Sequence, residues 1–290
     1  MNKRDEFIKK KDKDNGGHYL SPDKKLEYLE RMIVPYQKNG TTNYFLKQYL
    51  DADGNELRKK FWATNSSSRF AFEMYSWLAK ENRVKNITFE EKLVGIANSP
   101  RNPNMDVYIE LDNKDIFIES KLTEKYPQNL KSLSISYYSD DKDAQIRRYR
   151  NHEDAANEFK IFIVSFVNRT QKDLSPCWFD FKQEITHLVG LYLTIVSDVK
   201  YKNKEIEFYN VYYDFGDTLN EVVKDFFEEA QKMMNRLLVE KKKCLSFKYD
   251  CCSAQDFVKK QILPFNPEQS AFGIKKPIEK ILEEQFDFIF

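Results

Sequence analysis

The spacing of apolar and polar residues along the chain predicts a core of alternating helices and strands. In residues 66–82 apolar side chains recur every three or four positions, which is the spacing of an amphipathic helix. The stripe of this helix is formed by Phe70, Met74, Trp77 and Leu78. Further along, segments whose apolar residues alternate with polar ones, or run without interruption, are typical of strands. The predicted strands are residues 86–96, 105–111, 115–123, 159–167, 189–199 and 204–215.

Helix signals complete this pattern toward both ends of the chain. Ser21 followed by Pro22 is a typical helix start, because Ser caps free N–H groups and Pro suits the first helical position. Helices are predicted at residues 21–36, 140–158 and 218–240, with a shorter one from Ser253 and a helical start to the tail at 277–290. The core order, α-β-β-β-α-β, predicts a mixed sheet flanked by helices, with added strands and C-terminal helices, on the border between α/β and α+β domains.

The same pattern divides the chain into an N-terminal extension and one main domain. Residues 51–57 contain a turn sequence, so we expect a hairpin that joins residues 41–50 to residues 57–64. We expect residues 1–64 to form an extension packed on the core. Residues 65–290 would form the main domain with a C-terminal helical elaboration. The chain has 290 residues, 41% of them hydrophobic, which is enough for one large domain with such an extension.

The second and third predicted strands read as a hairpin with a defined register. Asp112 and Asn113 suit its two-residue turn, because both residue types tolerate the left-handed backbone that such turns need. This register places apolar residues opposite each other on one face, which supports it. The apolar pairs are Ile109 with Ile116 and Val107 with Ile118.

The other face of this hairpin collects charged side chains. Asp106 lies opposite Glu119, and Lys121 follows on the same face; a four-residue loop would change the pairing but leave all three there. Opposed carboxylates destabilise a sheet unless a cation neutralises them, and Mg²⁺ prefers carboxylate oxygens. A bound metal can activate water and stabilise charge on a phosphodiester, with help from a nearby lysine. The alternative is an ordinary solvated face with a ladder of charges.

This arrangement resembles the PD-(D/E)XK nuclease superfamily. "PNMD", residues 103–106, is similar to its first half, with two residues between Pro and Asp in place of none, and "ESK", residues 119–121, matches its second half. The resemblance implies that Asp106 and Glu119 bind Mg²⁺, with Mn²⁺ as an alternative. It also implies that the Ser120 carbonyl is a further ligand and that Lys121 is the catalytic lysine.

Two further motifs extend the resemblance beyond the hairpin. Many members place a Glu on the helix before the sheet, and Glu73 shares the apolar stripe of the predicted helix there, so we expect it to act in catalysis and metal binding. "QIRRY" resembles a QxxxY element, which implies supporting roles for Gln145 and Tyr149 on one helix face. The neighbouring arginines are expected to contact phosphates of the nucleic acid. They are Arg147, Arg148 and Arg150.

Together these segments resemble a narrower, largely uncharacterised family of restriction-endonuclease-like proteins. The resemblance rests on "SSSRFAFEMYSWL", "FEEKLVGI", "PNMDVYI" and "ESKLTEKY", and it covers about residues 65–215. Ser120 stands where that family often has Cys, which removes no chelating side chain. The resemblance implies a restriction-endonuclease-like core.

Composition and charge limit what can be expected of the partner and of the cellular compartment. The 47 Lys and Arg residues nearly balance the 46 Asp and Glu residues, so net charge neither supports nor excludes a nucleic-acid partner. The four Cys contain no CxxC pair and the three His are scattered, so we expect no structural zinc site. Neither a signal peptide nor a long apolar stretch is evident, so we expect a cytoplasmic protein that does not enter membranes.

We therefore expect a Mg²⁺-dependent nuclease that hydrolyses phosphodiester bonds, specifically a DNA endonuclease of restriction or defence type. The alternative, from a different class, is a catalytically silent nuclease-fold protein that binds nucleic acid or a protein partner. The intact Asp, Glu and Lys set argues against that alternative. The choice between DNA and RNA stays open, and so do a homodimer and an activating protein partner.

Overall fold

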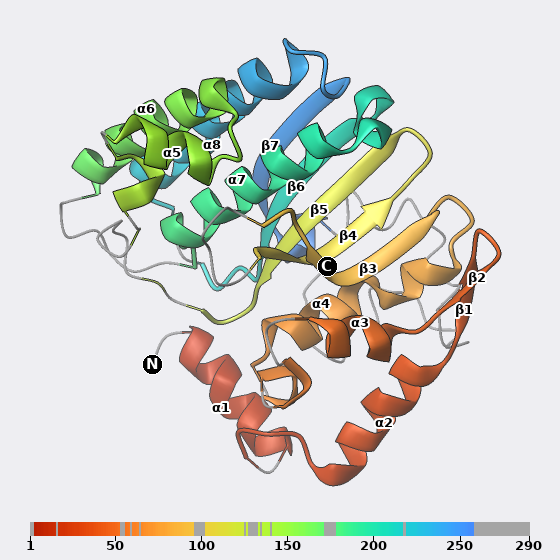
Figure 1. Cartoon of the computed structure of the whole chain (residues 1–290). Coiled ribbons are helices and arrows are strands. Elements are labelled where there is room, and N and C mark those ends of the chain that lie inside the picture. The colour runs from red at the N-terminus through yellow and green to blue at the C-terminus, as the bar shows by residue number, and fades with distance from the viewer. Residues whose placement is uncertain are drawn as a thin grey trace.

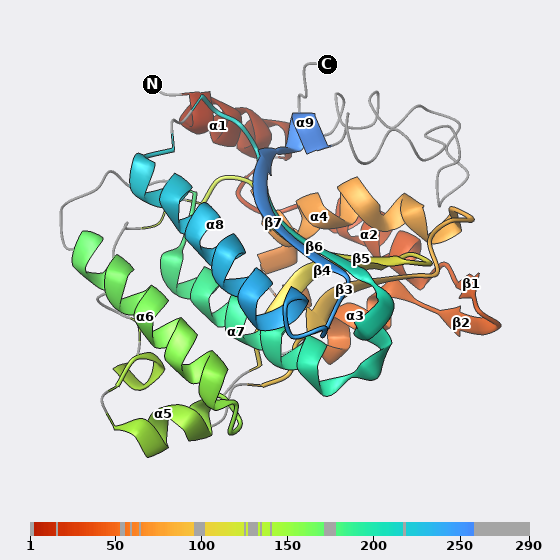
Figure 2. The same cartoon turned by 90° about the horizontal axis from the view of Figure 1, so that it is seen from above.

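The computed structural model shows a five-stranded mixed β-sheet between two layers of helices (Figures 1 and 2). The structure describes residues 3–15, 17–52, 56–58, 60–63, 65–95, 102–124, 126, 133, 135–139, 141–170, 178–216 and 219–257. In spatial order the strands are β3 (Asn86–Lys92), β4 (Asn104–Glu110), β5 (Lys114–Lys121), β6 (Glu205–Tyr212) and β7 (Ser246–Ser253). The first three run antiparallel, and β5, β6 and β7 run parallel. The expected mixed α/β fold is confirmed.

The β4–β5 hairpin has the predicted register. The Leu111 N–H donates to the Lys114 carbonyl at 2.8 Å, so Asp112 and Asn113 form a two-residue turn. The apolar pairs lie opposite each other as predicted, Val107 with Ile118 and Ile109 with Ile116. Continuing this register by one residue places Asp106 opposite Glu119.

The N-terminal segment, residues 3–80, packs on one face of the sheet. Its elements are α1 (Lys3–Asn15), α2 (Pro22–Ile33), the strand pair β1 (Tyr36–Lys38) and β2 (Thr41–Asn43), α3 (Phe45–Asp51), the 3₁₀ helices η1 (Glu56–Arg58) and η2 (Lys60–Trp62), α4 (Ser67–Tyr75) and η3 (Ser76–Lys80). Their buried aromatic residues share one core with Phe89 and Ile118 of the sheet and with Phe257 of α9 (Ala254–Phe257). The extension thus packs on the sheet, while a domain boundary at residue 64 stays a prediction.

A second layer of helices covers the other face of the sheet, which Figure 2 shows edge-on. This layer comprises η4 (Ile135–Tyr137), α5 (Lys142–Arg148), α6 (Glu153–Arg169), α7 (Phe181–Ser197), η5 (Val199–Asn203) and α8 (Glu221–Met234), with a π-helical turn at Asn235–Val239. Its side chains form a second core with Phe117 and Phe208 of the sheet. Because the two cores lie on opposite faces, alternate residues of β5 enter different cores.

Two segments that the sequence predicts as strands are helices. Residues 159–167 lie inside α6, and most of residues 189–199 lie in α7. In α6 the buried residues follow helical spacing, while Ile161 between them is 70% exposed. In α7 the buried residues run without a break from His187 to Leu193. A continuous apolar run fits a buried strand and a buried helix equally well, so the strand prediction was wrong. The strand that ends the predicted α-β-β-β-α-β order is therefore β6.

The N-terminal hairpin prediction was also wrong. The strand pair is the short β1–β2 ribbon, residues 45–51 form α3, and strand β7 was not predicted. The predicted helix at 140–158 is broken between α5 and α6, where Arg150 and Asn151 adopt left-handed backbone. The predicted tail helix at 277–290 lies outside the described residues. Among the helices in the described ranges, none is long and apolar enough to cross a membrane.

Candidate functional site

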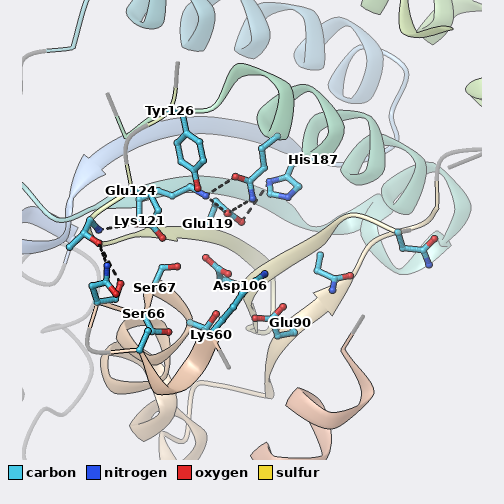
Figure 3. A pocket seen from close by; sticks show the side chains of 17 residues that line it. Lys60, Ser66, Ser67, Glu90, Asp106, Glu119, Lys121, Glu124, Tyr126 and His187 are labelled. Atoms are coloured by element: carbon cyan, nitrogen blue, oxygen red, sulfur yellow. Dashed lines mark hydrogen bonds and ion pairs between the residues drawn. The ribbon is translucent and has the colours of Figure 1, made fainter. Parts of the chain in front are cut away.

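A cavity of about 660 Å³ lies where β3, β4 and β5 meet the first turns of α4 and α7 (Figure 3). Both helices begin there because polar residues cap them. The Ser66 hydroxyl accepts the Arg69 N–H at 3.1 Å, and an Asp180 oxygen accepts the Lys182 N–H at 3.0 Å. Lys60 from the N-terminal extension also lines the cavity. The site is therefore built by both helical layers and the sheet between them.

The structure brings together three of the predicted site residues, Asp106, Glu119 and Lys121, which all line this cavity. The Lys121 Nζ donates to Glu119 Oε1 at 2.7 Å. Asp106 Oδ2 accepts the main-chain N–H of Ser120 at 2.6 Å, which places the Ser120 main chain beside this carboxylate. Glu119 and Lys121 are only 3% and 4% exposed, so this face is not a solvated charge ladder.

Burial and mutual repulsion shape the charges of this site. Burial raises the pKa of Asp106 well above its usual range, and the carboxylates of Glu119 and Glu90 raise it further. Burial alone would lower the pKa of Lys121, but Glu119 above all outweighs that effect and holds the pKa well above its ordinary value. Lys121 is therefore protonated, and Asp106 is a carboxyl group whose ionised form a cation would stabilise.

Helix α7 supplies two cavity residues that sequence reasoning missed. Gln183 Oε1 accepts from Lys121 Nζ at 2.7 Å, and Gln183 Nε2 donates to Glu119 Oε1 at 2.7 Å. One turn later, His187 Nδ1 lies 3.7 Å from Glu119 Oε2. Gln and His at positions i and i+4, after the helix cap Asp180, were the available signal. The strand prediction for the following residues concealed it.

Tyr149 of the predicted QxxxY element does not line the cavity. Tyr149 is fully buried in the core under α5 and α6, where its hydroxyl donates to the Tyr137 carbonyl at 3.1 Å and its ring stacks on Phe159. The side chain of Gln145 lies outside the described part of the structure. The helix that reaches the cavity from this side of the sheet is α7, and the supporting role expected of Gln145 and Tyr149 stays a prediction.

Glu73 is buried, as its place in the apolar stripe predicts, but it does not line the cavity. Both of its carboxylate oxygens accept hydrogen bonds from the Arg31 guanidinium of α2, one of them at 3.0 Å. A buried carboxylate needs a partner, and here the partner is an arginine. The structure therefore does not bring Glu73 to the proposed metal.

The three predicted phosphate-binding arginines lie away from the cavity lining. The Arg148 guanidinium lies 3.9 Å from the centre of the Tyr137 ring. Arg150 Nε donates to the Gly95 carbonyl at 2.7 Å, and Arg147 is exposed. Arg148 and Arg150 thus hold loops together, and direct phosphate contact stays a prediction for all three arginines.

Glu90 adds a third carboxylate to the row that Asp106 and Glu119 form across the sheet. Glu90 lines the cavity, and continuing the β3–β4 register places it opposite Asp106. Its φ of 55° lies in the left-handed region, which is uncommon for a residue other than glycine and concentrates at functional sites. Glu124 also lines the cavity, but its Oε2 accepts the N–H groups of Leu122 and Thr123 at 2.7 and 2.9 Å.

The donor set fits a hard divalent cation. Mg²⁺ is usually held by one or two carboxylates together with water and substrate phosphate. Asp106 and Glu119 supply such a pair, and a bound cation would favour the ionised form of Asp106, whose pKa burial and the neighbouring Glu119 and Glu90 raise. Within the ranges that the structure describes, no group of three or more His, Cys, Asp or Glu side chains is arranged to hold a metal ion.

A mixed sheet whose central hairpin presents Asp, Glu and Lys side chains to a cavity places this chain in the restriction-endonuclease-like class. The chain belongs to the family described as restriction endonuclease associating with ARP, whose model matches residues 3–260. That match takes in the N-terminal extension as well as the sheet and both helical layers. Neither a curated protein nor a solved structure gives a significant match.

Proposed function

We propose that this protein is a metal-dependent endonuclease that hydrolyses phosphodiester bonds of DNA. The observation that carries this proposal is the cavity face of the β4–β5 hairpin. There Asp106 lies opposite Glu119, and the Lys121 ammonium group is hydrogen-bonded to Glu119. The family's description as a restriction endonuclease supports DNA as the polymer.

Asp106 and Glu119 would hold the cation, Mg²⁺ or Mn²⁺, with the adjacent Ser120 carbonyl as a further ligand. When bound, the ion supplies a lower pKa for an attacking water and stabilisation of charge on the phosphate. The sheet fixes both carboxylates, because each lies on a strand that is paired on both sides. Such rigid placement suits a site that must hold its ligands in one geometry.

Lys121 acts as a cation and hydrogen-bond donor, because its raised pKa keeps it protonated. In that state it can orient the attacking water and stabilise the negative charge that develops on phosphorus oxygens during in-line displacement. Gln183 positions it, because one amide contacts both Lys121 and Glu119 and so fixes their spacing.

The opposite wall of the cavity suits a phosphate group. It is formed by Ser66, Ser67 and Ser68 at the start of α4, and by Lys60. The first turn of a helix presents free N–H groups and the positive end of the helix dipole, which attract anions. A phosphate held there would face the carboxylates across the cavity.

We also propose that the chain works with a protein partner, in line with the association with ARP in the family description. The net charge of +1 gives little general attraction for DNA. A partner that contributes DNA affinity or activation would supply what the chain itself lacks.

The test is cleavage of plasmid DNA, single-stranded DNA and RNA in Mg²⁺, in Mn²⁺ and in EDTA. Lys121→Met keeps the length of the side chain but removes its charge, so we expect cleavage to fall about 100-fold or more. Lys182→Ala, an exposed neighbour of Gln183, is the matched control and should cleave like the wild type.

Two outcomes would contradict the proposal. Cleavage that survives both EDTA and Lys121→Met would exclude this mechanism. DNA bound without cleavage in either metal, with the family's protein partner present, would favour the catalytically silent nuclease-fold alternative.

A further inference from the structure

Strands β3 and β7 are the two edges of the five-stranded sheet in the part of the chain that the structure describes. The outer side of an edge strand carries N–H and C=O groups that can pair with a strand of another chain. Helix α3 lies against β3, and helix α8 lies against β7 (Figures 1 and 2). The contacts of these two helices therefore decide whether another strand can be added to the sheet.

Gln48 of α3 closes the edge of β3 with its side-chain amide. Its Nε2 donates to the Ile87 carbonyl at 3.1 Å, and its Oε1 accepts the Phe89 N–H at 2.9 Å. The Tyr36 hydroxyl donates to the same Ile87 carbonyl at 2.9 Å. One glutamine thus occupies the carbonyl of one residue and the N–H group two residues further along, which are the groups that an added strand would use.

Gln231 of α8 makes the same pair of contacts at the opposite edge, on β7. Its Nε2 donates to the Phe247 carbonyl at 2.6 Å, and its Oε1 accepts the Tyr249 N–H at 2.5 Å. The next N–H group on this edge, that of Cys251, donates to Asp250 Oδ1 at 2.8 Å. Each edge of the sheet is therefore capped by a glutamine from a different helical layer.

The two amides reproduce the bonds of one residue in a parallel neighbouring strand. In a parallel ladder, a residue donates its N–H to a carbonyl of the next strand and accepts the N–H that lies two positions further along. Gln48 and Gln231 donate and accept in this pattern. Another strand cannot pair at these positions until the amide leaves. The repetition of the pattern by two helices far apart in the sequence argues against an accidental contact.

We propose that Gln48 and Gln231 are caps that close both edges of the sheet to strands of other chains, including a second copy of this chain. A second copy or a protein partner then meets the helical layers and does not extend the sheet. The inference is independent of the proposed nuclease activity, because neither glutamine lines the cavity.

The first test is hydrogen exchange of the main-chain amides of Phe89 and Tyr249, measured by nuclear magnetic resonance on the full chain. Both amides should exchange slowly in the wild type. Gln48→Met and Gln231→Met keep the length of the side chain but cannot form the two hydrogen bonds. Each substitution should speed exchange about tenfold or more at its own edge only, so each variant is the control for the other.

The second test is sedimentation velocity over a range of protein concentrations, with both substitutions combined in one double variant. We expect the double variant to associate with itself about tenfold more tightly than the wild type. Pairing of strands between copies should also slow the exchange of Phe89 and Tyr249 again as the concentration rises. Gln37→Met is the matched control, because this exposed glutamine contacts β2 and not an edge of the sheet.

Thermal unfolding at low concentration checks that the variants are folded. Fast exchange of Phe89 and Tyr249 in the wild type would overturn the inference without any variant. A folded double variant that associates no more than Gln37→Met would also overturn it. So would association of the double variant while both amides stay in fast exchange, because the copies would then meet at another surface.

Discussion

Three buried carboxyl groups and the half-buried Asp106 are accommodated in four different ways near the sheet. Glu73 pairs with the guanidinium of Arg31, and Glu119 accepts hydrogen bonds from Lys121 and Gln183. Glu184 takes up a proton near neutral pH, whereas Asp106 accepts a main-chain N–H and lines the cavity. Glu73 and Glu184 are therefore structural acids, whereas Asp106 and Glu119 can bind a cation. The positions of these residues in the sequence do not reveal the distinction.

The raised pKa of Glu184 predicts how the stability of the protein depends on pH. An unfolded Glu has a pKa of about 4.3, while burial raises the pKa of Glu184 in the fold to about 8. The folded state therefore holds the proton more tightly. The stabilisation from this group is complete below the unfolded pKa and is lost as pH rises through about 8. Glu184→Gln keeps an acceptor oxygen but cannot ionise, so its stability should fall less between pH 5 and pH 8.

The measurement is urea unfolding of both proteins across that pH range in EDTA. The difference in the free energy of unfolding between the variant and the wild type should change by up to about 4 kcal/mol over these three pH units. Parallel profiles for the two proteins would show that Glu184 is ionised in the fold throughout.

At the scale of elements, local signals predicted the β4–β5 hairpin and therefore the central part of the site. A two-residue turn and strict alternation fix the register, and the register places Asp106, Glu119 and Lys121 on one face. The same reasoning failed for α6, because the exposed positions of that helix include the apolar Ile161 and Val164. It failed for α7, because its buried residues run without a break from His187 to Leu193 and leave no polar face there to reveal the helical period. Gln183 and His187 were missed for that reason, since only tertiary packing brings α7 to the hairpin.

The ion pair between α2 and α4 gives a prediction at this scale. Glu73→Gln leaves the Arg31 charge largely buried without its carboxylate, so we expect the free energy of unfolding to fall by about 3–5 kcal/mol. Replacing both residues, as Arg31→Met with Glu73→Leu, should recover much of this loss. Mn²⁺ and Mg²⁺ affinities should not change, because Glu73 does not line the cavity.

Denaturant unfolding and metal titration of the same samples check both parts of this prediction. Lys47→Ala breaks the exposed pair with Asp51 and serves as the control, with an expected cost below about 1 kcal/mol. A Glu73→Gln variant with normal stability and weakened metal binding would restore the metal-ligand role that the sequence suggested.

For the whole molecule, the N-terminal extension is part of both the core and the site. Its aromatic side chains pack in the same cluster as Phe72 of α4 and Phe89 of β3, and Lys60 and Ala63 line the cavity. The family model begins at residue 3, which agrees with an extension that belongs to the folding unit. A sheet with one uncovered apolar face would not remain in solution as a compact monomer.

Deletion of residues 1–64 should therefore abolish cooperative folding. We expect the fragment that starts at residue 65 to aggregate or to lack the near-ultraviolet circular dichroism of packed aromatic residues, because its sheet loses one apolar layer. Deletion of residues 1–20, which removes α1 but keeps α2, is the comparison and should retain a cooperative transition. A soluble fragment with sharp thermal unfolding would show that residues 65–290 form an autonomous domain.

The position of β5 between an antiparallel and a parallel neighbour has a consequence for a growing chain. The hairpin that carries the carboxylates joins strands close in sequence, and it is fully synthesised once Lys121 has been made. Gln183 lies 62 residues beyond Lys121, and the parallel partner β6 comes later still. A polypeptide interrupted between Lys121 and Gln183 already carries the site carboxylates Asp106 and Glu119. It still lacks the Gln183 amide, which contacts both Glu119 and Lys121, and the His187 imidazole. Completion of the centre thus depends on synthesis of the second helical layer, long after its first residues have left the ribosome.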